Sequence, residues 1–146
     1  MKERERDRVR TIAVSGSASG IGAAVRTLLS AGGARVIGVD RREAEVIADL
    51  SRAADRATAI AAVEEACAGV LDGLVTCAGI GSGFDEPARI RVNYFGTVDL
   101  LAGLRPSLAR AGSPAAVAVA SNAMTAVPGI PAALVDACLA GDEERA

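Results

Sequence analysis

Short apolar runs alternate along this chain with longer stretches whose apolar residues recur at helical spacing. This alternation is typical of a parallel β-sheet whose faces are covered by helices. The sequence therefore predicts an α/β protein. The expected strands are residues 12–14, 35–39, 46–50, 72–77 and 115–121.

The segments between these runs are the expected helices. The pattern predicts helices at residues 23–29, 53–68 and 88–111, and a brief one at 41–45. Pro106 lies inside the long stretch 88–111. Because proline lacks an N–H and clashes with the preceding turn, we expect a kink or an early end near Leu104.

A glycine-spaced turn follows the first strand, with Gly16, Gly20 and Gly22 leading into a helix. Backbone N–H groups at such a turn point into open space, where a pyrophosphate can accept them and gain from the helix dipole. Asp40 ends the second apolar run eighteen residues after Gly22, close to the spacing of the acid in a dinucleotide-binding βαβ unit. The alternative is an ordinary turn in a glycine-rich chain, since 16 of the 146 residues are glycine.

Composition narrows the remaining function classes. The chain is one domain long and 51% apolar, so it can form a core, but only 2% of its residues are aromatic. A net charge of −2 does not indicate a basic surface for binding nucleic acid, and no apolar run is long enough to span a membrane. Residues 1–10 alternate in charge and lack the apolar centre of a signal peptide. We expect a cytoplasmic protein with a solvated extension at 1–10 and one domain at 11–146.

The cysteines are spaced too widely for a zinc knuckle or a redox pair, and histidine is absent. Metal catalysis and histidine acid–base chemistry are therefore not expected, and no metal site is predicted. Cys67 and Cys138 are expected to be reduced and mostly buried. Cys77 differs because it ends the fourth predicted strand.

Several motifs, in order and spacing, resemble those of the short-chain dehydrogenase/reductase family. They are Ser15-Gly16-x-x-x-Gly20-Ile21-Gly22, Asp40, Asp49-Leu50, Cys77-Ala78-Gly79, Asn93-x-x-Gly96 and Ser121. Residues 39–51 and 92–96 are most similar to the bacterial 3α-hydroxysteroid dehydrogenase/carbonyl reductase subgroup. The resemblance runs from about Thr11 to the end of the chain, and it implies a Rossmann-like, doubly wound sheet with strand order 3-2-1-4-5.

The resemblance implies a nicotinamide dinucleotide at the glycine turn. Gly16, Gly20 and Gly22 would provide the tight turn, the approach to the pyrophosphate and the helix packing, with Ile21 beside them. Ser17 and Ser19 would donate hydroxyls to phosphate or, equally, cap the helix. Asp40 would accept the ribose hydroxyls and repel a 2′-phosphate, which favours NAD over NADP. Arg41 and Arg42 soften this preference, because a guanidinium can hold such a phosphate.

Two further motifs are implied to contact the cofactor. Asp49 would bond the adenine and Leu50 would pack on it; the alternative is an ordinary strand end. Cys77, Ala78 and Gly79 occupy the place of the family's Asn-Ala-Gly motif, where small residues leave room for the cofactor. Cysteine in place of asparagine removes an amide that usually ties the sheet together, although the subgroup resembles this variant.

The resemblance also implies two catalytic positions. Asn93 corresponds to an asparagine that organises a water chain to the active site; the alternative is a solvent-exposed side chain. Ser121 corresponds to the serine that bonds the substrate oxygen, although serines are also common at strand ends. The family's reaction further needs a tyrosine with a lysine four residues later.

The chain lacks that pair of residues. Its one tyrosine, Tyr94, precedes Ser121 and has Val98 four residues later, and its one lysine is Lys2. We therefore expect the NAD-binding N-terminal portion of a dehydrogenase that exchanges hydride between NAD(H) and a secondary alcohol or ketone, with hydroxysteroids among the implied substrates, and no turnover by this portion alone. Whether the chain is itself an enzyme stays open.

The expected portion lacks the family's C-terminal strands, so the fifth strand becomes an open edge with Val117 and Val119 uncovered. Such a surface invites association or a partner that completes the sheet. The alternative function is therefore a non-catalytic dinucleotide-binding module, or one completed by a partner. Residues 88–111 are the expected contact in any oligomer.

Overall fold

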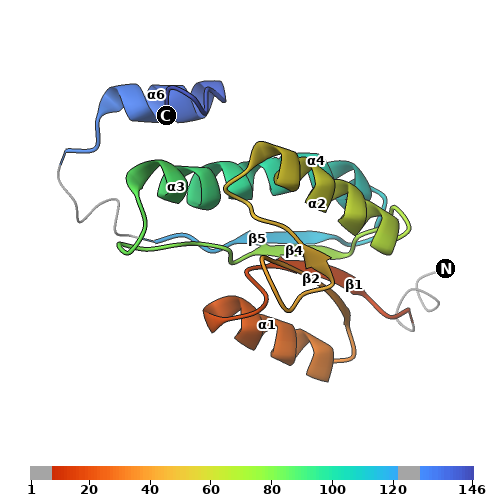
Figure 1. The fold of residues 1–146 in the computed structure, drawn as a ribbon. Coiled ribbons are helices and arrows are strands. Elements are labelled where there is room, and N and C mark those ends of the chain that lie inside the picture. Colours follow the sequence, from red (N-terminus) through yellow and green to blue (C-terminus); the bar gives the residue numbers. More distant parts are fainter. Residues whose placement is uncertain (1–7, 122–128) are drawn as a thin grey trace.

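The structure is a computed structural model that describes residues 8–121 and 129–146. It has a parallel five-stranded sheet in the order β3-β2-β1-β4-β5, as the sequence predicts. Helix α1 covers one face of the sheet, and α2 and α4 cover the other (Figure 1). The strands are β1 (Thr11–Ser15), β2 (Arg35–Asp40), β3 (Val46–Ile47), β4 (Gly73–Thr76) and β5 (Ala115–Ala118).

Most helices begin and end close to the predicted positions, but residues 41–45, β3 and α6 differ from the prediction. They are α1 (Gly20–Ala31), α2 (Ala53–Ala66), α3 (Glu86–Ile90), the π-helical η1 (Arg91–Phe95), α4 (Gly96–Ala109) and α6 (Ala132–Ala140). Residues 41–45 form bends instead of the expected brief helix, and β3 is shorter than predicted. Helix α6 was not predicted.

The predicted early end near Leu104 is wrong, because α4 continues through Pro106 to Ala109. Proline at this position removes the hydrogen bond to the carbonyl of Ala102. Ala102 and Pro106 are both exposed, so water can satisfy that carbonyl. The start of the long helical stretch is set by Asp85, whose carboxylate accepts the N–H of Ala88 at 2.7 Å.

The core lies between the sheet and the α2–α4 layer. Small and branched aliphatic side chains fill it, as the near absence of aromatics predicts. The central strand β1 is buried along its whole length, which is typical of a parallel sheet covered on both faces. The core cluster includes Ala13, Ile37, Val63, Leu74, Leu100 and Leu104.

A buried arginine joins this core to the end of the chain. The side chain of Arg56 on α2 is almost fully buried and donates to Asp99 of α4 at 2.6 Å and to the carbonyl of Leu50 at 3.0 Å. It also pairs with Glu143, which follows α6. Burial opposes the charge of Arg56, but its hydrogen bonds to both carboxylates raise its pKa above the usual value. The pair with Glu143 therefore links the segment after α6 to α2.

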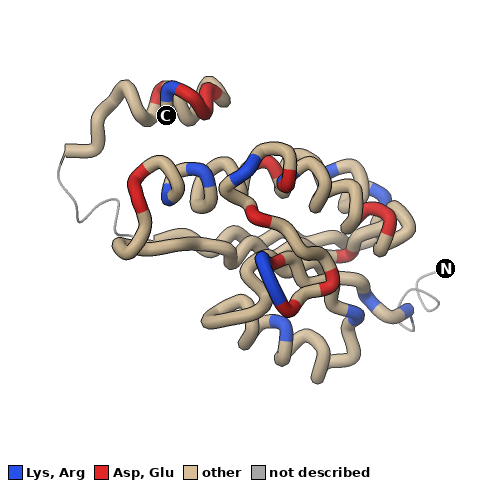
Figure 2. Tube along the Cα trace, viewed as in Figure 1, with Lys and Arg blue, Asp and Glu red and all other residues tan. Residues whose placement is uncertain are grey.

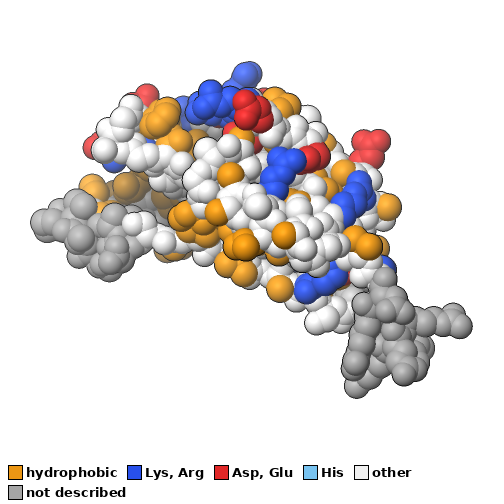
Figure 3. Space-filling view, turned by 90° about the horizontal axis from the view of Figure 1, so that it is seen from below, with side chains coloured by type: hydrophobic (Ala, Val, Ile, Leu, Met, Phe, Trp, Pro, Cys, Tyr) orange, Lys and Arg blue, Asp and Glu red, His pale blue; other side chains and the backbone are white. Residues whose placement is uncertain are grey.

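Charged residues of both signs and exposed hydrophobic residues are spread over the described part of the chain. Figure 2 shows acidic and basic residues interspersed along the described chain. Figure 3, seen from the side of α1, shows hydrophobic side chains exposed at many places on this face. Among the described helices, none combines the length and apolar character needed to cross a membrane.

Candidate functional site

The glycine turn after β1 is shaped by contacts that exclude side chains. Gly16 has φ +70°, and a Cβ there would lie 2.8 Å from the backbone of Ala78. A Cβ on Gly22 would lie 2.0 Å from the carbonyl oxygen of Gly16. The N–H of Gly16 donates to Val39 at 2.8 Å, so the turn is tied to β2 as well as to the segment after β4. Two of the three glycines therefore allow backbones to meet.

Gly20 serves a different purpose. Its φ of +53° favours glycine, but a Cβ there would meet nothing within 4 Å. The open space lies at the N-terminus of α1, where Ser19 is in the N-cap position without forming a side-chain cap hydrogen bond. The N–H groups of the first turn of α1 therefore lack a side-chain cap and can serve an anion.

The neighbouring side chains divide between the core and solvent. Ser17 is only 2% exposed, and its hydroxyl has no hydrogen-bond partner among the described residues. That hydroxyl would lie 2.4 Å from a Cβ on Gly38, so it lies close to β2. Ser19 and Ile21 are exposed beside the open space at Gly20.

Asp40, the last residue of β2, is bonded to the glycine turn. One of its carboxylate oxygens accepts the N–H of Ala18 at 3.0 Å, and the other accepts that of Arg41 at 2.7 Å. Each carboxylate oxygen can accept about two hydrogen bonds, so both have capacity left. Asp40 is half-buried, whereas Arg41 and Arg42 are exposed. The turn thus has an acceptor at its side.

Asp49 and Leu50, after β3, lie in different surroundings. Asp49 is half-buried and accepts the N–H of Ser51 at 3.0 Å and its hydroxyl at 2.7 Å. Burial tends to raise the pKa of Asp49. The hydrogen bonds from Ser51 outweigh this effect, together with the charges of Arg41 and Arg52, so this pKa lies below its usual value. Leu50 is buried in the core, with its Cβ 3.3 Å from where a Cβ on Gly96 would lie.

The segment after β4 passes close to the glycine turn. The N–H of Cys77 donates to the carbonyl of Ser15 at 3.1 Å, and the N–H of Ala78 donates to the Ser15 hydroxyl at 3.2 Å. Burial raises the pKa of the Cys77 thiol, so the thiol stays protonated at neutral pH. Gly79 is exposed beyond it. Small residues are required here because Gly16 lies against Ala78.

Asn93 holds the same segment from the opposite side. Its side-chain oxygen accepts the N–H of Ile80 at 2.8 Å, and its amide donates to the carbonyl of Ile80 at 3.0 Å. Asn93 is an exposed residue of η1, yet its amide is fully engaged with the backbone. π-Helical turns often occur at functional sites. The asparagine therefore fixes the chain directly after Gly79.

Ser121 lies beyond the end of β5. The strand's hydrogen bonds to β4 continue to Val119, whose N–H donates to Thr76 at 3.0 Å. Ser121 is exposed and is the last residue described before the gap at 122–128.

Most of the residues singled out in the sequence follow the carboxyl ends of strands. Gly16, Cys77 and Ser121 come after β1, β4 and β5, and Asp40 is the last residue of β2. Ligands of open α/β sheets bind along this edge. Leu50 also follows a strand, β3, but its side chain packs in the core and not at this edge.

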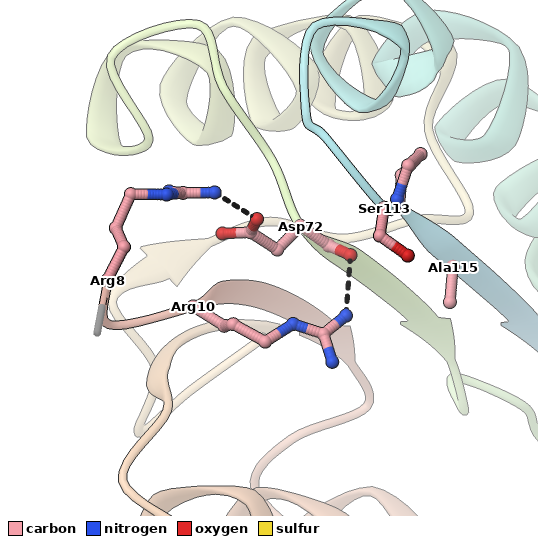
Figure 4. Close-up of a pocket in the computed structure, with 6 residues that line it drawn as sticks. Arg8, Arg10, Asp72, Ser113 and Ala115 are labelled. Carbon is pink, nitrogen blue, oxygen red and sulfur yellow. Dashed lines mark hydrogen bonds and ion pairs between the residues drawn. The ribbon is translucent and has the colours of Figure 1, made fainter. Parts of the chain in front are cut away.

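A hollow lies at the amino ends of the strands, at the opposite edge of the sheet from the glycine turn (Figure 4). Its volume is about 340 Å³, and Arg8, Arg10 and Asp72 line it with Ser113, Pro114 and Ala115. Arg8 pairs with the buried carboxylate of Asp72, and Arg10 donates to the carbonyl of Asp72 at 3.2 Å. The hollow is open and far from the glycine turn, at the amino ends of the strands. These contacts attach residues 8–10 to the sheet.

Comparison with known proteins assigns the family. A family model described as short chain dehydrogenase matches residues 10–132. The chain belongs to the short-chain dehydrogenase family.

Two relatives of the predicted subgroup match nearly all of this chain. A 3-alpha-hydroxysteroid dehydrogenase/carbonyl reductase of Comamonas testosteroni is 43% identical over 136 residues, which are 92% of this chain and 53% of that protein. The 3-alpha-hydroxysteroid dehydrogenase of Pseudomonas sp. B-0831, solved with NADH, is 52% identical with a TM-score of 0.88. That match covers 92% of this chain and 54% of the solved one. The chain thus spans about half the length of these relatives.

A more distant likeness supports the fold alone. The ligand-free aldohexose dehydrogenase of Thermoplasma acidophilum is 23% identical, with a TM-score of 0.71. The match covers 92% of this chain and 58% of that one.

The structure also reveals residues that sequence reasoning missed. Glu45 accepts the N–H of Gly38 at 2.7 Å and pairs with Arg26 of α1. No local pattern indicates this arrangement, because it depends on how α1 packs beside the β2–β3 connection. Arg56 could have been found, since it shares the apolar face of α2 with Ala59 and Val63 at helical spacing. In the described part of the chain, no three acidic, cysteine or histidine side chains cluster to hold a metal ion.

Proposed function

We propose that this chain binds a nicotinamide adenine dinucleotide along the carboxyl edge of its sheet. The observation that carries the proposal is the glycine turn. Gly16 and Gly22 leave no room for side chains, whereas Gly20 opens onto space at the N-terminus of α1. A pyrophosphate in that space would accept N–H groups and gain from the helix dipole. The NADH bound to the Pseudomonas relative supports the same conclusion.

Asp40 is the proposed contact to the adenosine ribose. Its two carboxylate oxygens retain capacity for two hydroxyl donors next to the turn. Its negative charge would repel a 2′-phosphate, which favours NAD over NADP. Arg41 follows directly and is exposed, so the preference depends on how the segment after Asp40 is held.

The remaining contacts are proposed from the positions of the motifs. Asp49, ionised at neutral pH, would accept a hydrogen bond from the adenine amine. Ala78 and Gly79 would leave room for the cofactor backbone, with Cys77 behind them. For Leu50 we propose an indirect role through the core, because its side chain packs against Gly96. Ser17 would pack on the buried side of the turn, and Ser19 and Ile21 would face the phosphates.

For the reaction we propose hydride exchange between NAD(H) and a secondary alcohol or ketone, the class to which hydroxysteroids belong. The cofactor supplies or accepts the hydride when bound. Ser121 would bond the substrate oxygen, and Asn93 would fix the segment at Ile80 and order water beside it. The proton would need a tyrosine activated by a lysine, and the 146 residues offer only Tyr94 and Lys2. We therefore propose binding without turnover by these residues alone.

A second candidate function is a dinucleotide-binding module completed by a partner. The observation that favours it is β5, which ends the sheet in the described residues and has Val117 54% and Val119 42% exposed. An edge of this kind is ready to pair with another strand. Thermal unfolding separates the two: a module with its own stable fold, to which a partner adds a strand, should unfold cooperatively as 146 residues, whereas a portion of a larger dehydrogenase should be marginally stable.

The site is tested by titrating NADH, with binding followed by its fluorescence. We expect saturable binding that Asp40→Ala weakens about tenfold or more, because two charge-assisted hydrogen bonds are lost. Asp136→Ala, on an exposed part of α6, is the matched control and should bind as the parent does. Equal affinity of the parent and Asp40→Ala, with both folded by circular dichroism, would remove Asp40 from the site.

A further inference from the structure

In the connection between β2 and β3, the side chain of Glu45 bonds back to β2. Val39 and Asp40 pair with Val46 and Ile47, so Gly38 precedes the start of this pairing. One carboxylate oxygen of Glu45 accepts the N–H of Gly38 at 2.7 Å in place of a backbone carbonyl. A Cβ on Gly38 would lie 2.8 Å from that oxygen, so a larger residue there would displace the Glu45 carboxylate. The side chain of Glu45 thus extends the edge of the sheet.

Arg26 of α1 holds the same connection at two points. It pairs with the second carboxylate oxygen of Glu45 and donates to the carbonyl of Glu43 at 3.3 Å. The backbone between them is irregular, and Glu43 has φ +52°. The side chains of Arg26 and Glu45 are 32% and 44% exposed, and ion pairs of this kind add little to overall stability. Their main effect is to fix the path of residues 41–45.

That path decides which charge lies near the proposed ribose position. The connection starts at Asp40, which is bonded to Ala18 of the turn, and it ends at Glu45. Only four residues lie between these two anchors, and they include Arg41 and Arg42. The charge of Arg41 helps to lower the pKa of Asp49, so this guanidinium lies within electrostatic reach of the acid after β3. A looser connection would let either arginine approach the ribose.

We propose that Glu45 is a positioning residue that determines the preference for NAD over NADP. By holding residues 41–45 against Gly38 and Arg26, it keeps the Asp40 carboxylate at the ribose and the two guanidiniums away from a 2′-phosphate. The inference rests on the proposed function, since it concerns the selectivity of that same site.

The test is the ratio of the dissociation constants for NADPH and NADH, measured with the whole chain. We expect Glu45→Ala to lower this ratio about threefold to tenfold. Glu45→Gln should lower it less, because its amide oxygen can still accept the N–H of Gly38. Arg26→Gln should act in the same direction. Glu43→Gln is the matched control: it removes the same charge from the same connection, and its side chain has no hydrogen bond or ion pair among the described residues.

The outcomes separate this inference from the function on which it rests. Absence of NADH binding by the folded parent chain would overturn the proposed function. Parent binding that Asp40→Ala weakens, with an unchanged ratio in Glu45→Ala and Arg26→Gln, would overturn the role of Glu45 alone. An equal change in Glu43→Gln would do the same, because the effect would then be general charge. If Glu45→Ala does not fold, the same ratio measured in Glu45→Gln and Arg26→Gln tests the role of Glu45.

Discussion

Single glycines in the turn after β1 have separable roles. Gly22 allows α1 to pack on the carbonyl of Gly16, and Gly20 allows a positive φ beside open space. The first role concerns stability, and the second concerns access to the proposed phosphate position. The same residue type is therefore required at two neighbouring positions for different physical reasons.

Substitution of these two glycines by alanine should give opposite patterns. Gly22→Ala should destabilise the protein by about 3 kcal/mol, because a backbone contact of 2.0 Å must be relieved by moving α1 or the turn. Gly20→Ala should cost only about 1 kcal/mol for its left-handed backbone, but it should weaken NADH binding by placing a methyl group in the open space. Urea denaturation and NADH titration measure the two effects. Similar losses of stability in both variants would contradict this division.

Between elements, hydrogen bonds from side chains to the backbone position the segments of the site. Asp40 joins β2 to the glycine turn, Asn93 joins η1 to the segment after β4, and Glu45 joins the β2–β3 connection to Gly38. In each case a side chain of one element replaces a backbone partner that the sheet does not supply. The edge of the sheet is therefore ordered beyond the ends of its strands.

The contact of Asn93 with Ile80 can be measured by amide hydrogen exchange. Asn93→Ala should remove protection of the Ile80 N–H and cost about 1 kcal/mol of stability, because two hydrogen bonds at an exposed position are lost. Asn93→Asp keeps an acceptor for that N–H and should retain most of the protection. Unaltered exchange at Ile80 in Asn93→Ala would show that the segment is held by other contacts.

In the whole molecule, the parallel sheet has a well-covered centre and an exposed edge at β5. Strand β1 is fully buried, whereas every residue of β5 is exposed. The loss of cover at Val117 and Val119 is as the sequence predicts. The arrangement leaves the proposed dinucleotide edge on the covered part of the sheet and places Ser121 on the exposed part.

The whole chain should bind NADH without catalysing hydride transfer. The printed residues contain no tyrosine and lysine in the spacing that the reaction needs. Incubation with NAD and a hydroxysteroid or a simple secondary alcohol, followed by NADH absorbance, should give the background rate. The Pseudomonas relative serves as the positive control. Sustained turnover that Ser121→Ala abolishes would show that another group supplies the proton.

Much of the fold was determined locally and could be predicted from the sequence. The alternation of apolar runs and helical stretches predicted a parallel sheet, the family resemblance implied its strand order, and the glycine spacing located the turn before α1. Departures occurred where tertiary contacts outweigh local patterns. Residues 41–45 do not form a helix, because Glu45 pairs with Arg26 of α1. Helix α4 continues through Pro106, because that side of the helix faces solvent.

The sequence by itself determined where along the chain the strands and the glycine turn lie, because residue period and glycine conformation are properties of short segments. The roles of the individual site residues stay predictions. Only the tertiary structure decided that Leu50 packs in the core, that Asn93 holds Ile80 and that Glu45 binds Gly38. Apart from the short Glu45 connection, these partners come from separate elements. No short pattern encodes a contact that forms only when the elements pack against one another.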